Sequence, residues 1–115
     1  MPRDLKAYLQ DILGAGESIL EFIGTKSLDE YQKTDQTKAA VERKYSIIGE
    51  AINQALSHYP ELAGKINMDR DIVDFRNRII HEYFTVNDVL IYSITKRDLP
   101  ELLAEIRELL LEMPS

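Results

Sequence analysis

The segment 41–59, VERKYSIIGEAINQALSHY, decides the fold that the sequence predicts. Its apolar side chains recur at alternating spacings of four and three residues, at Val41, Tyr45, Ile48, Ile52, Ala55 and Tyr59. This spacing is typical of one face of an amphipathic α-helix. Pro60 follows, and proline does not continue a helix. We therefore expect a long helix that begins at Ser27 or Thr34 and ends near Tyr59, with His58 in its last turn, where an imidazolium suits the helix dipole.

A second row of residues runs beside this stripe at the same spacing: Glu42, Ser46, Gly49 and Asn53. The small side chains in the row would allow another helix to approach closely. Packing inside one monomer and packing between two subunits both explain the row.

The segment before the long helix predicts a first helix over residues 4–23. Its apolar stripe consists of Leu5, Leu9, Ile12, Ile19, Leu20 and Ile23. Gly14 and Gly16 lower helix propensity, and Gly16 lies in the stripe itself, where it would permit a close helix contact or a bend. Gly24 supplies a stop, and Ser27 with Glu30 three residues later predicts a capping box.

The segment after Tyr59 predicts a loop over 60–69 with a few anchoring apolar residues. A third helix over about 70–84, a short helix over 88–95 and a last helix that ends near Met113 are expected to follow. Asp98 is a candidate cap of the last helix, and Pro100 suits its first turn. The last helix has an apolar stripe of Leu99, Leu102, Leu103, Ile106, Leu109, Leu110 and Met113. No stretch alternates with period two, so we expect no sheet. Residues 1–115 thus predict one all-α domain, an up-down bundle of four main helices plus a short helix.

The composition restricts the functional classes. Cysteine is absent, which excludes disulfides and thiolate metal sites. No apolar run approaches the ~18 residues of a membrane span, and the N-terminal residues do not resemble a signal peptide. We expect a soluble cytoplasmic protein that has no membrane contact.

The charge is negative overall but unevenly distributed. The chain has 14 basic and 20 acidic residues, a net charge of −6, which argues against broad coating of nucleic acid. Residues 65–97 have six basic and five acidic residues, a net charge of +1, and the rest of the chain is therefore at −7. Any contact with a polyanion is expected within 65–97, although a mixed surface that keeps the domain soluble explains the same charges.

The stretch 74–84, DFRNRIIHEYF, contains one of the two histidines. On a helix, Arg76 would project from the middle of an apolar stripe, and Asp74, Asn77 and His81 would lie about 100–160° away on its flank. A charge in an apolar face needs a partner or an interface, because an unpaired buried charge is very costly. Function is expected where a sequence conflicts with its own pattern in this way.

The residue types in this stretch suit attack on a phosphodiester. Histidine is a general acid or base near neutral pH, and arginine binds phosphate and stabilises charge developing on its oxygens. RNA supplies a nucleophile in its 2′-OH, so a metal is not required. The glycines form no phosphate-binding loop, and two distant histidines without cysteine predict no metal site and no cofactor. A single histidine in the motif leaves the acid–base pair incomplete, and a two-fold dimer would complete it.

The pattern Arg76-Asn77-X-Ile-Ile-His81-X-Tyr83 resembles the signature of the HEPN superfamily, an arginine followed after four to six residues by histidine. The tyrosine and the helical frame resemble the HepT-like toxins of prokaryotic toxin–antitoxin pairs. The segments 43–51, RKYSIIGEA, and 98–102, DLPEL, resemble the mid-chain helix and the start of the last helix in those proteins. The similarity extends over nearly the whole chain.

This resemblance implies a metal-independent endoribonuclease toxin with a composite cleft at a homodimer interface. Arg76 would bind the scissile phosphate, and His81 would activate the 2′-OH or protonate the leaving group. Asn77 would orient the substrate, and Tyr83 would line the cleft. The resemblance also implies a nucleotidyltransferase antitoxin, which can transfer AMP to Tyr83. The added phosphate would then block RNA beside Arg76.

Two other interpretations remain open from the residues alone. The first is a non-catalytic helical module that docks on a nucleotidyltransferase or binds a nucleotide. The second is a dimeric bundle in which Arg76 pairs across the interface with an acidic residue such as Asp74 or Glu50.

Overall fold

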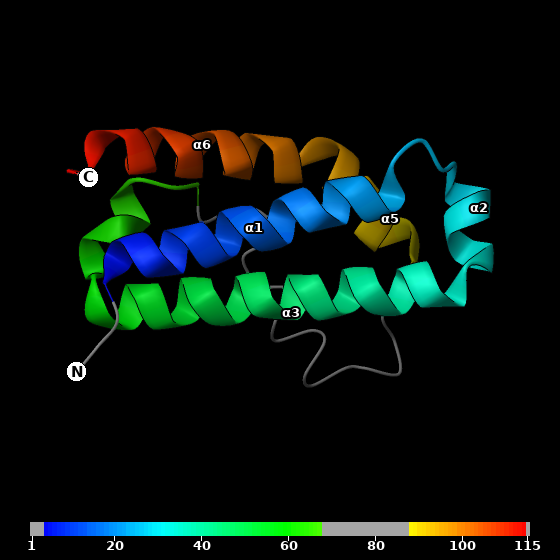
Figure 1. The fold of residues 1–115 in the computed structure, drawn as a ribbon, viewed down its shortest axis with the longest axis horizontal. Coiled ribbons are helices and arrows are strands. Elements are labelled where there is room, and N and C mark those ends of the chain that lie inside the picture. The colour runs from blue at the N-terminus through cyan, green and yellow to red at the C-terminus, as the bar shows by residue number, and fades with distance from the viewer. Residues whose placement is uncertain (1–3, 68–87, 115) are drawn as a thin grey trace.

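The computed structural model describes residues 4–67 and 88–114, and every regular element in these ranges is helical. The elements are α1 (Leu5–Ile23), α2 (Leu28–Lys33), α3 (Asp35–His58), the 3₁₀ helix η1 (Pro60–Gly64), α5 (Asp88–Arg97) and α6 (Leu99–Glu112) (Figure 1). These ranges contain no strand, which confirms the predicted all-α class. The helix predicted over 70–84 lies outside the described residues.

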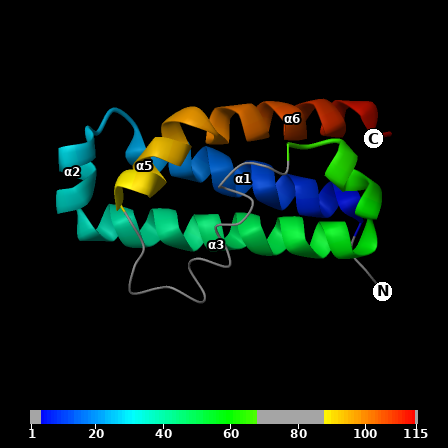
Figure 2. The same cartoon turned by 180° about the vertical axis from the view of Figure 1, so that it is seen from behind.

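The long helices run up and down, as predicted. Helix α1 lies between α3 and α6 and is antiparallel to both (Figure 1). Helix α2 forms the connection between α1 and α3 at one end of the bundle, and η1 packs against α3 at the other end. Seen from behind, α5 lies between α2 and the start of α6 (Figure 2). Among the helices described, none combines the length and hydropathy needed to cross a membrane.

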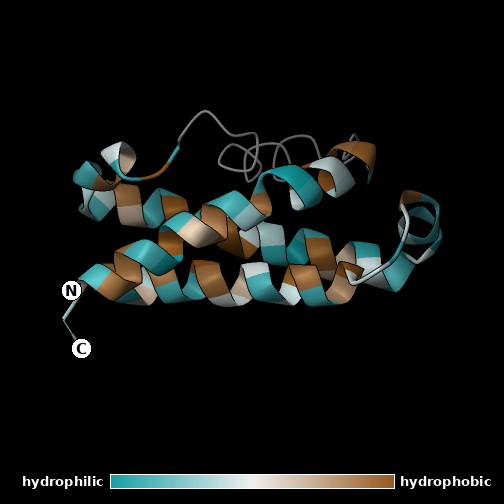
Figure 3. Ribbon diagram, turned by 90° about the horizontal axis from the view of Figure 1, so that it is seen from above, coloured by the Kyte–Doolittle hydropathy of each residue, from teal (hydrophilic) through white to brown (hydrophobic). Residues whose placement is uncertain are grey.

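The predicted apolar stripes form most of the core. Each of the three long helices alternates hydrophobic and hydrophilic segments along its length (Figure 3). The buried side chains of the predicted stripes are Leu9, Ile12, Ile19 and Ile23 of α1, Val41, Tyr45, Ile48, Ile52 and Ala55 of α3, and Leu99, Leu102, Leu103, Ile106 and Leu109 of α6. The prediction that Leu20 belongs to the buried stripe is wrong, since its side chain is 37% exposed. It lies about 100° from Ile19 around the helix, which places it at the edge of the buried face.

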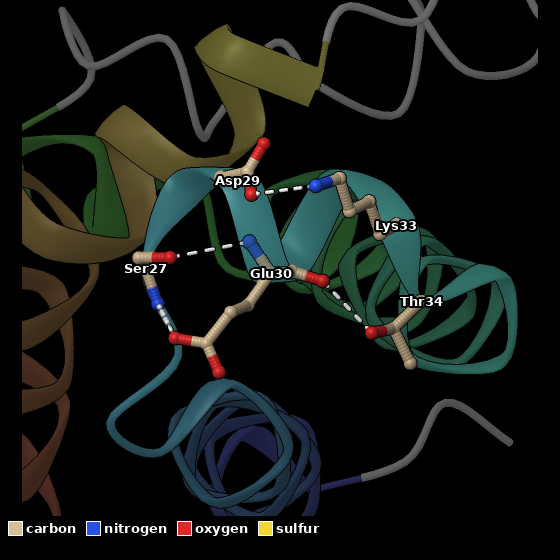
Figure 4. Close-up of polar contacts among 5 residues, drawn as sticks. All are labelled: Ser27, Asp29, Glu30, Lys33 and Thr34. Carbon is tan, nitrogen blue, oxygen red and sulfur yellow. Dashed lines mark hydrogen bonds and ion pairs between the residues drawn. The ribbon is translucent and has the colours of Figure 1, made fainter.

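The second helix that the sequence predicts consists of two helices, α2 and α3. The capping box that the sequence predicts is present: the backbone N–H of Glu30 donates to Ser27 Oγ at 3.2 Å, and the N–H of Ser27 donates to Glu30 Oε1 at 3.1 Å (Figure 4). This box begins the short α2, which stops at Lys33, and α3 then begins at Asp35. The Thr34 hydroxyl donates to the Glu30 carbonyl at 2.8 Å, which satisfies an acceptor at the end of α2.

Two local predictions near the ends of helices need correction. The segment expected to be a loop over 60–69 begins instead with the 3₁₀ helix η1, whereas its expected anchoring by apolar residues is confirmed, because Leu62 and Ile66 are buried. Asp98 occupies the position before α6 but makes no capping hydrogen bond. Its carboxylate instead accepts from Arg97 Nε at 2.8 Å, which turns it away from the first turn of the helix. Pro100 does lie in the first turn, as predicted.

Gly16 and Gly14 of α1 differ in the space that surrounds them. A Cβ added at Gly16 would lie 2.5 Å from Cδ2 and 2.9 Å from Cδ1 of the fully buried Leu103, so this glycine permits the close contact between α1 and α6. A Cβ at Gly14 would meet nothing within 4 Å.

We expect Gly16→Val to destabilise the fold by about 1–3 kcal/mol, because it overpacks the α1–α6 contact. Gly14→Ala should stabilise it by about 0.5–1 kcal/mol through helix propensity alone. Urea unfolding followed by circular dichroism measures both values. Equal effects of the two variants would contradict the close contact at Gly16.

Candidate active site

The four predicted site residues all belong to the segment 68–87. Arg76, Asn77, His81 and Tyr83 therefore lie outside the described residues, and their catalytic arrangement stays a prediction. Glu50, a candidate partner of Arg76, lies on α3, and its Oε1 accepts from Gln54 Nε2 at 2.8 Å. The structure defines the parts of the bundle from which this segment leaves and to which it returns.

The chain leaves the described bundle at Asn67. Leu62 of η1 is 1% exposed and Ile66 is 5% exposed, so both are part of the hydrophobic core. The backbone N–H of Asn67 donates to Glu105 Oε1 of α6 at 3.2 Å. These contacts fix the departure point against α6, on the end of the bundle where η1 packs.

The chain returns at Asp88, the first residue of α5. The Asp88 carboxylate lies 3.1 Å from Nζ of Lys38 on α3. A carboxylate in the first turn also suits the positive end of the helix dipole. This ion pair could not be predicted from sequence, because Lys38 and Asp88 are 50 residues apart and both have charged residues nearby in the chain.

Helix α5 is held in place by two hydrogen bonds formed by tyrosine hydroxyls. The Thr95 hydroxyl donates to the Ile91 carbonyl at 2.8 Å, so the buried contact between Tyr45 and Thr95 has the tyrosine as its donor. The Tyr92 hydroxyl donates to the carbonyl of Lys26 at 2.8 Å, and Nζ of Lys96 lies 5.3 Å from the centre of the Tyr92 ring. Helix α5 is thus connected to α3 and to the turn before α2.

Burial and neighbouring carboxylates shift three titratable groups in this region. Burial raises the pKa of Tyr31, and the charges of Glu42 and Asp88 raise it further. Burial also raises the pKa of Tyr45, although its hydrogen bond with Thr95 acts in the opposite direction. The pKa of Glu42 is raised, mainly by burial and then by Asp88, while Lys38 lowers it. At the junction of α2, α3 and α5, the ionised forms of Tyr31, Tyr45 and Glu42 are therefore disfavoured.

Replacing each of the two buried tyrosines by phenylalanine should change the free energy of unfolding in opposite directions. Tyr45 donates a buried hydrogen bond, and the Tyr31 hydroxyl is buried without a hydrogen-bond partner among the residues described. Tyr45→Phe should lower the free energy of unfolding at pH 7 by about 1 kcal/mol. Tyr31→Phe should raise it by about 1 kcal/mol, because it removes a buried polar group that is not satisfied. Denaturant unfolding of both variants measures this difference, and a loss of stability in Tyr31→Phe would contradict it.

The same tyrosines predict a loss of stability at alkaline pH. Their pKa values are raised above the ordinary value of 10.0, so the native state holds these protons more tightly than the unfolded state. Stability is then full below pH 10 and falls as the pH rises further, because the unfolded chain ionises first. The slope of unfolding free energy against pH above 10 should be less steep in both phenylalanine variants than in the wild type.

No group of three or more His, Cys, Asp and Glu side chains that could hold a metal occurs within 4–67 and 88–114. His58 lies in the last turn of α3, as predicted, and its ring stacks on Tyr8 of α1 with 6.4 Å between the ring centres. This contact gives His58 a packing role at the end of the bundle.

Comparison with known proteins identifies the family. A family model described as "Ribonuclease HepT-like" matches residues 12–109, a range that includes Arg76 and His81. The chain is 32% identical over 104 residues to "Putative RNase MJ1380" of Methanocaldococcus jannaschii, covering 90% of this chain and 94% of that protein. It is also 32% identical over 109 residues to "Probable ribonuclease HepT" of Thermococcus cleftensis, covering 95% and 98%. No solved structure matches the chain significantly. The protein belongs to the HepT-like ribonuclease family.

Proposed function

We propose that this protein is a metal-independent endoribonuclease and the toxin of a toxin–antitoxin pair. The observation that carries the proposal is the family match over residues 12–109, which encloses the whole Arg76–Tyr83 motif. The motif supplies the two groups that cleavage of RNA by its own 2′-OH requires, a general acid or base and a cation for the phosphate. Described helices precede and follow the segment 68–87 in the chain: α3 and η1 come before it, and α5 and α6 come after it.

The reaction follows from the chemistry of these groups. A base removes the proton of the 2′-OH, and the oxygen attacks the adjacent phosphorus. The bond from phosphorus to the 5′-oxygen breaks, and an acid protonates the leaving oxygen. The products are a 2′,3′-cyclic phosphate and a 5′-hydroxyl. His81 acts as base or acid, and Arg76 binds the phosphate and stabilises the charge that develops on its oxygens.

A homodimer supplies the second histidine that acid–base catalysis needs. Two copies related by a two-fold axis would bring two motifs to one cleft, where one His81 acts as base and the other as acid. Asn77 orients the substrate by hydrogen bonding, and Tyr83 lines the cleft.

A nucleotidyltransferase antitoxin is the proposed partner, and Tyr83 is its proposed target. Transfer of AMP to the Tyr83 hydroxyl places a phosphate beside Arg76, where its charge competes with that of RNA and its bulk fills the cleft. Regulation and catalysis would then depend on the same arginine.

The test is cleavage of a defined RNA by purified wild-type protein in EDTA, with mass spectrometry of the product ends. Cyclic phosphate and 5′-hydroxyl ends support the proposal. Tight binding to a nucleotidyltransferase without cleavage of any RNA would instead favour the non-catalytic helical module. Incubation with ATP and the nucleotidyltransferase should add AMP to the wild type and not to Tyr83→Phe, and the modified protein should no longer cleave.

A further inference from the structure

The Lys38 side chain of α3 connects three elements of the bundle. Its Nζ lies 3.1 Å from the Asp88 carboxylate of α5, 3.5 Å from the Gln32 carbonyl of α2 and 3.9 Å from the Asp35 carboxylate. The Lys38 and Asp88 side chains are only 26% and 21% exposed. The Lys33–Asp29 pair of α2, at 74% and 72%, is by contrast open to solvent. The Lys38–Asp88 contact is therefore partly shielded from water, which strengthens a charge pair.

The surroundings of Lys38 are acidic. Glu42 lies on α3 one turn after it, Asp35 lies before it, and the buried Tyr31 faces the same junction from α2. The hydrogen bond to Asp88 raises the pKa of Lys38, so its ammonium stays charged at physiological pH. Removal of this cation would leave Glu42 and Asp88 facing each other, and the first turn of α5 would be repelled from α3.

The place of Asp88 in the chain gives the contact its importance. Asp88 is five residues after Tyr83 and seven after His81. The hydrogen bonds of Thr95 with Tyr45 and of Tyr92 with Lys26 lie farther along the helix, and Ile91, one turn in, is buried in the core. The ion pair with Lys38 holds the first residue of α5, where the chain returns to the described bundle after the motif.

We propose that Lys38 is a positioning residue of the ribonuclease, which acts through Asp88 to anchor the first turn of α5 and thereby the end of the chain segment that carries His81. This inference rests on the proposed function for its effect on catalysis, and the anchor itself does not depend on that function. Lys38 is not assigned any contact with RNA. Catalysis is sensitive to such anchors, because small displacements of a catalytic group reduce the rate strongly.

The test compares Lys38→Ala, Lys38→Arg and the control Lys33→Ala, which removes the same charge from an exposed pair on α2. Hydrogen exchange by mass spectrometry, on peptides that cover 88–92, should be about tenfold faster in Lys38→Ala. It should return toward the wild-type rate in Lys38→Arg and stay unchanged in Lys33→Ala. Under saturating RNA, Lys38→Ala should lower kcat about tenfold with KM nearly unchanged, and Lys38→Arg should recover most of the loss.

Two results would overturn the proposal. Equal exchange in Lys38→Ala and Lys33→Ala over 88–92 would show that Lys38 does not anchor α5. Faster exchange with an unchanged kcat would show that the anchor does not position the catalytic groups. If the wild type cleaves no RNA, the proposed function fails, whereas the exchange rates of the three variants still decide whether Lys38 anchors the helix.

Discussion

His81→Ala is expected to lower the rate of RNA cleavage about 10²–10⁴-fold, the usual loss when a general acid or base is removed. In the proposed dimer, each cleft loses both its base and its acid at once, because both come from the same position in two copies. The loss should appear in kcat, since proton transfer occurs in the transition state. Single-turnover cleavage of a defined RNA in EDTA measures it.

The pH dependence of the wild type provides a second readout for His81. A bell-shaped profile of kcat near neutral pH is expected if one histidine acts as base and the other as acid. A mixed dimer of wild-type and His81→Ala chains has one His81 in its cleft, which can act as base or as acid but cannot supply both groups at once. Wild-type activity of His81→Ala in a protein with unchanged circular dichroism would refute the catalytic assignment.

Arg76→Ala is expected to reduce cleavage about 10²–10³-fold, because the cation that stabilises charge on the phosphate oxygens is lost. Arg78→Ala is the matched control, because it removes the same charge two residues away. On a helix Arg78 would project about 160° away from Arg76 around the helix axis. It is expected to face solvent and to pair there with Glu82, four residues later. The control should keep nearly full activity.

Arg76→Ala also separates a catalytic role from a structural one. If Arg76 only pairs across an interface with Asp74 or Glu50, its loss should dissociate or unfold the protein. Size-exclusion chromatography with light scattering and thermal unfolding of the variant decide this. A folded protein of unchanged mass with greatly reduced cleavage supports the catalytic role, and a dissociated or unfolded one contradicts it.

The helical frame could be predicted from local patterns because helices form between near neighbours in sequence. The four-and-three spacing in 41–59 placed Val41, Tyr45 and Ile52 in the core, and the Ser27–Glu30 box appeared where the sequence indicated it. Leu20 and Asp98 were predicted less well. Whether a residue at the edge of a stripe is buried, or which group a carboxylate binds, depends on neighbours from other helices.

The sequence by itself determined the fold class, most of the core and the motif Arg76–His81 with its expected chemistry. Periodicity and residue type are local properties, so they can be read without a tertiary structure. Only the tertiary structure decided that Gly16 meets Leu103, that Tyr45 donates to Thr95 and that Lys38 pairs with Asp88. These contacts join residues from distant parts of the chain. Their distances are set by the packing of the helices, and no spacing along the chain encodes them.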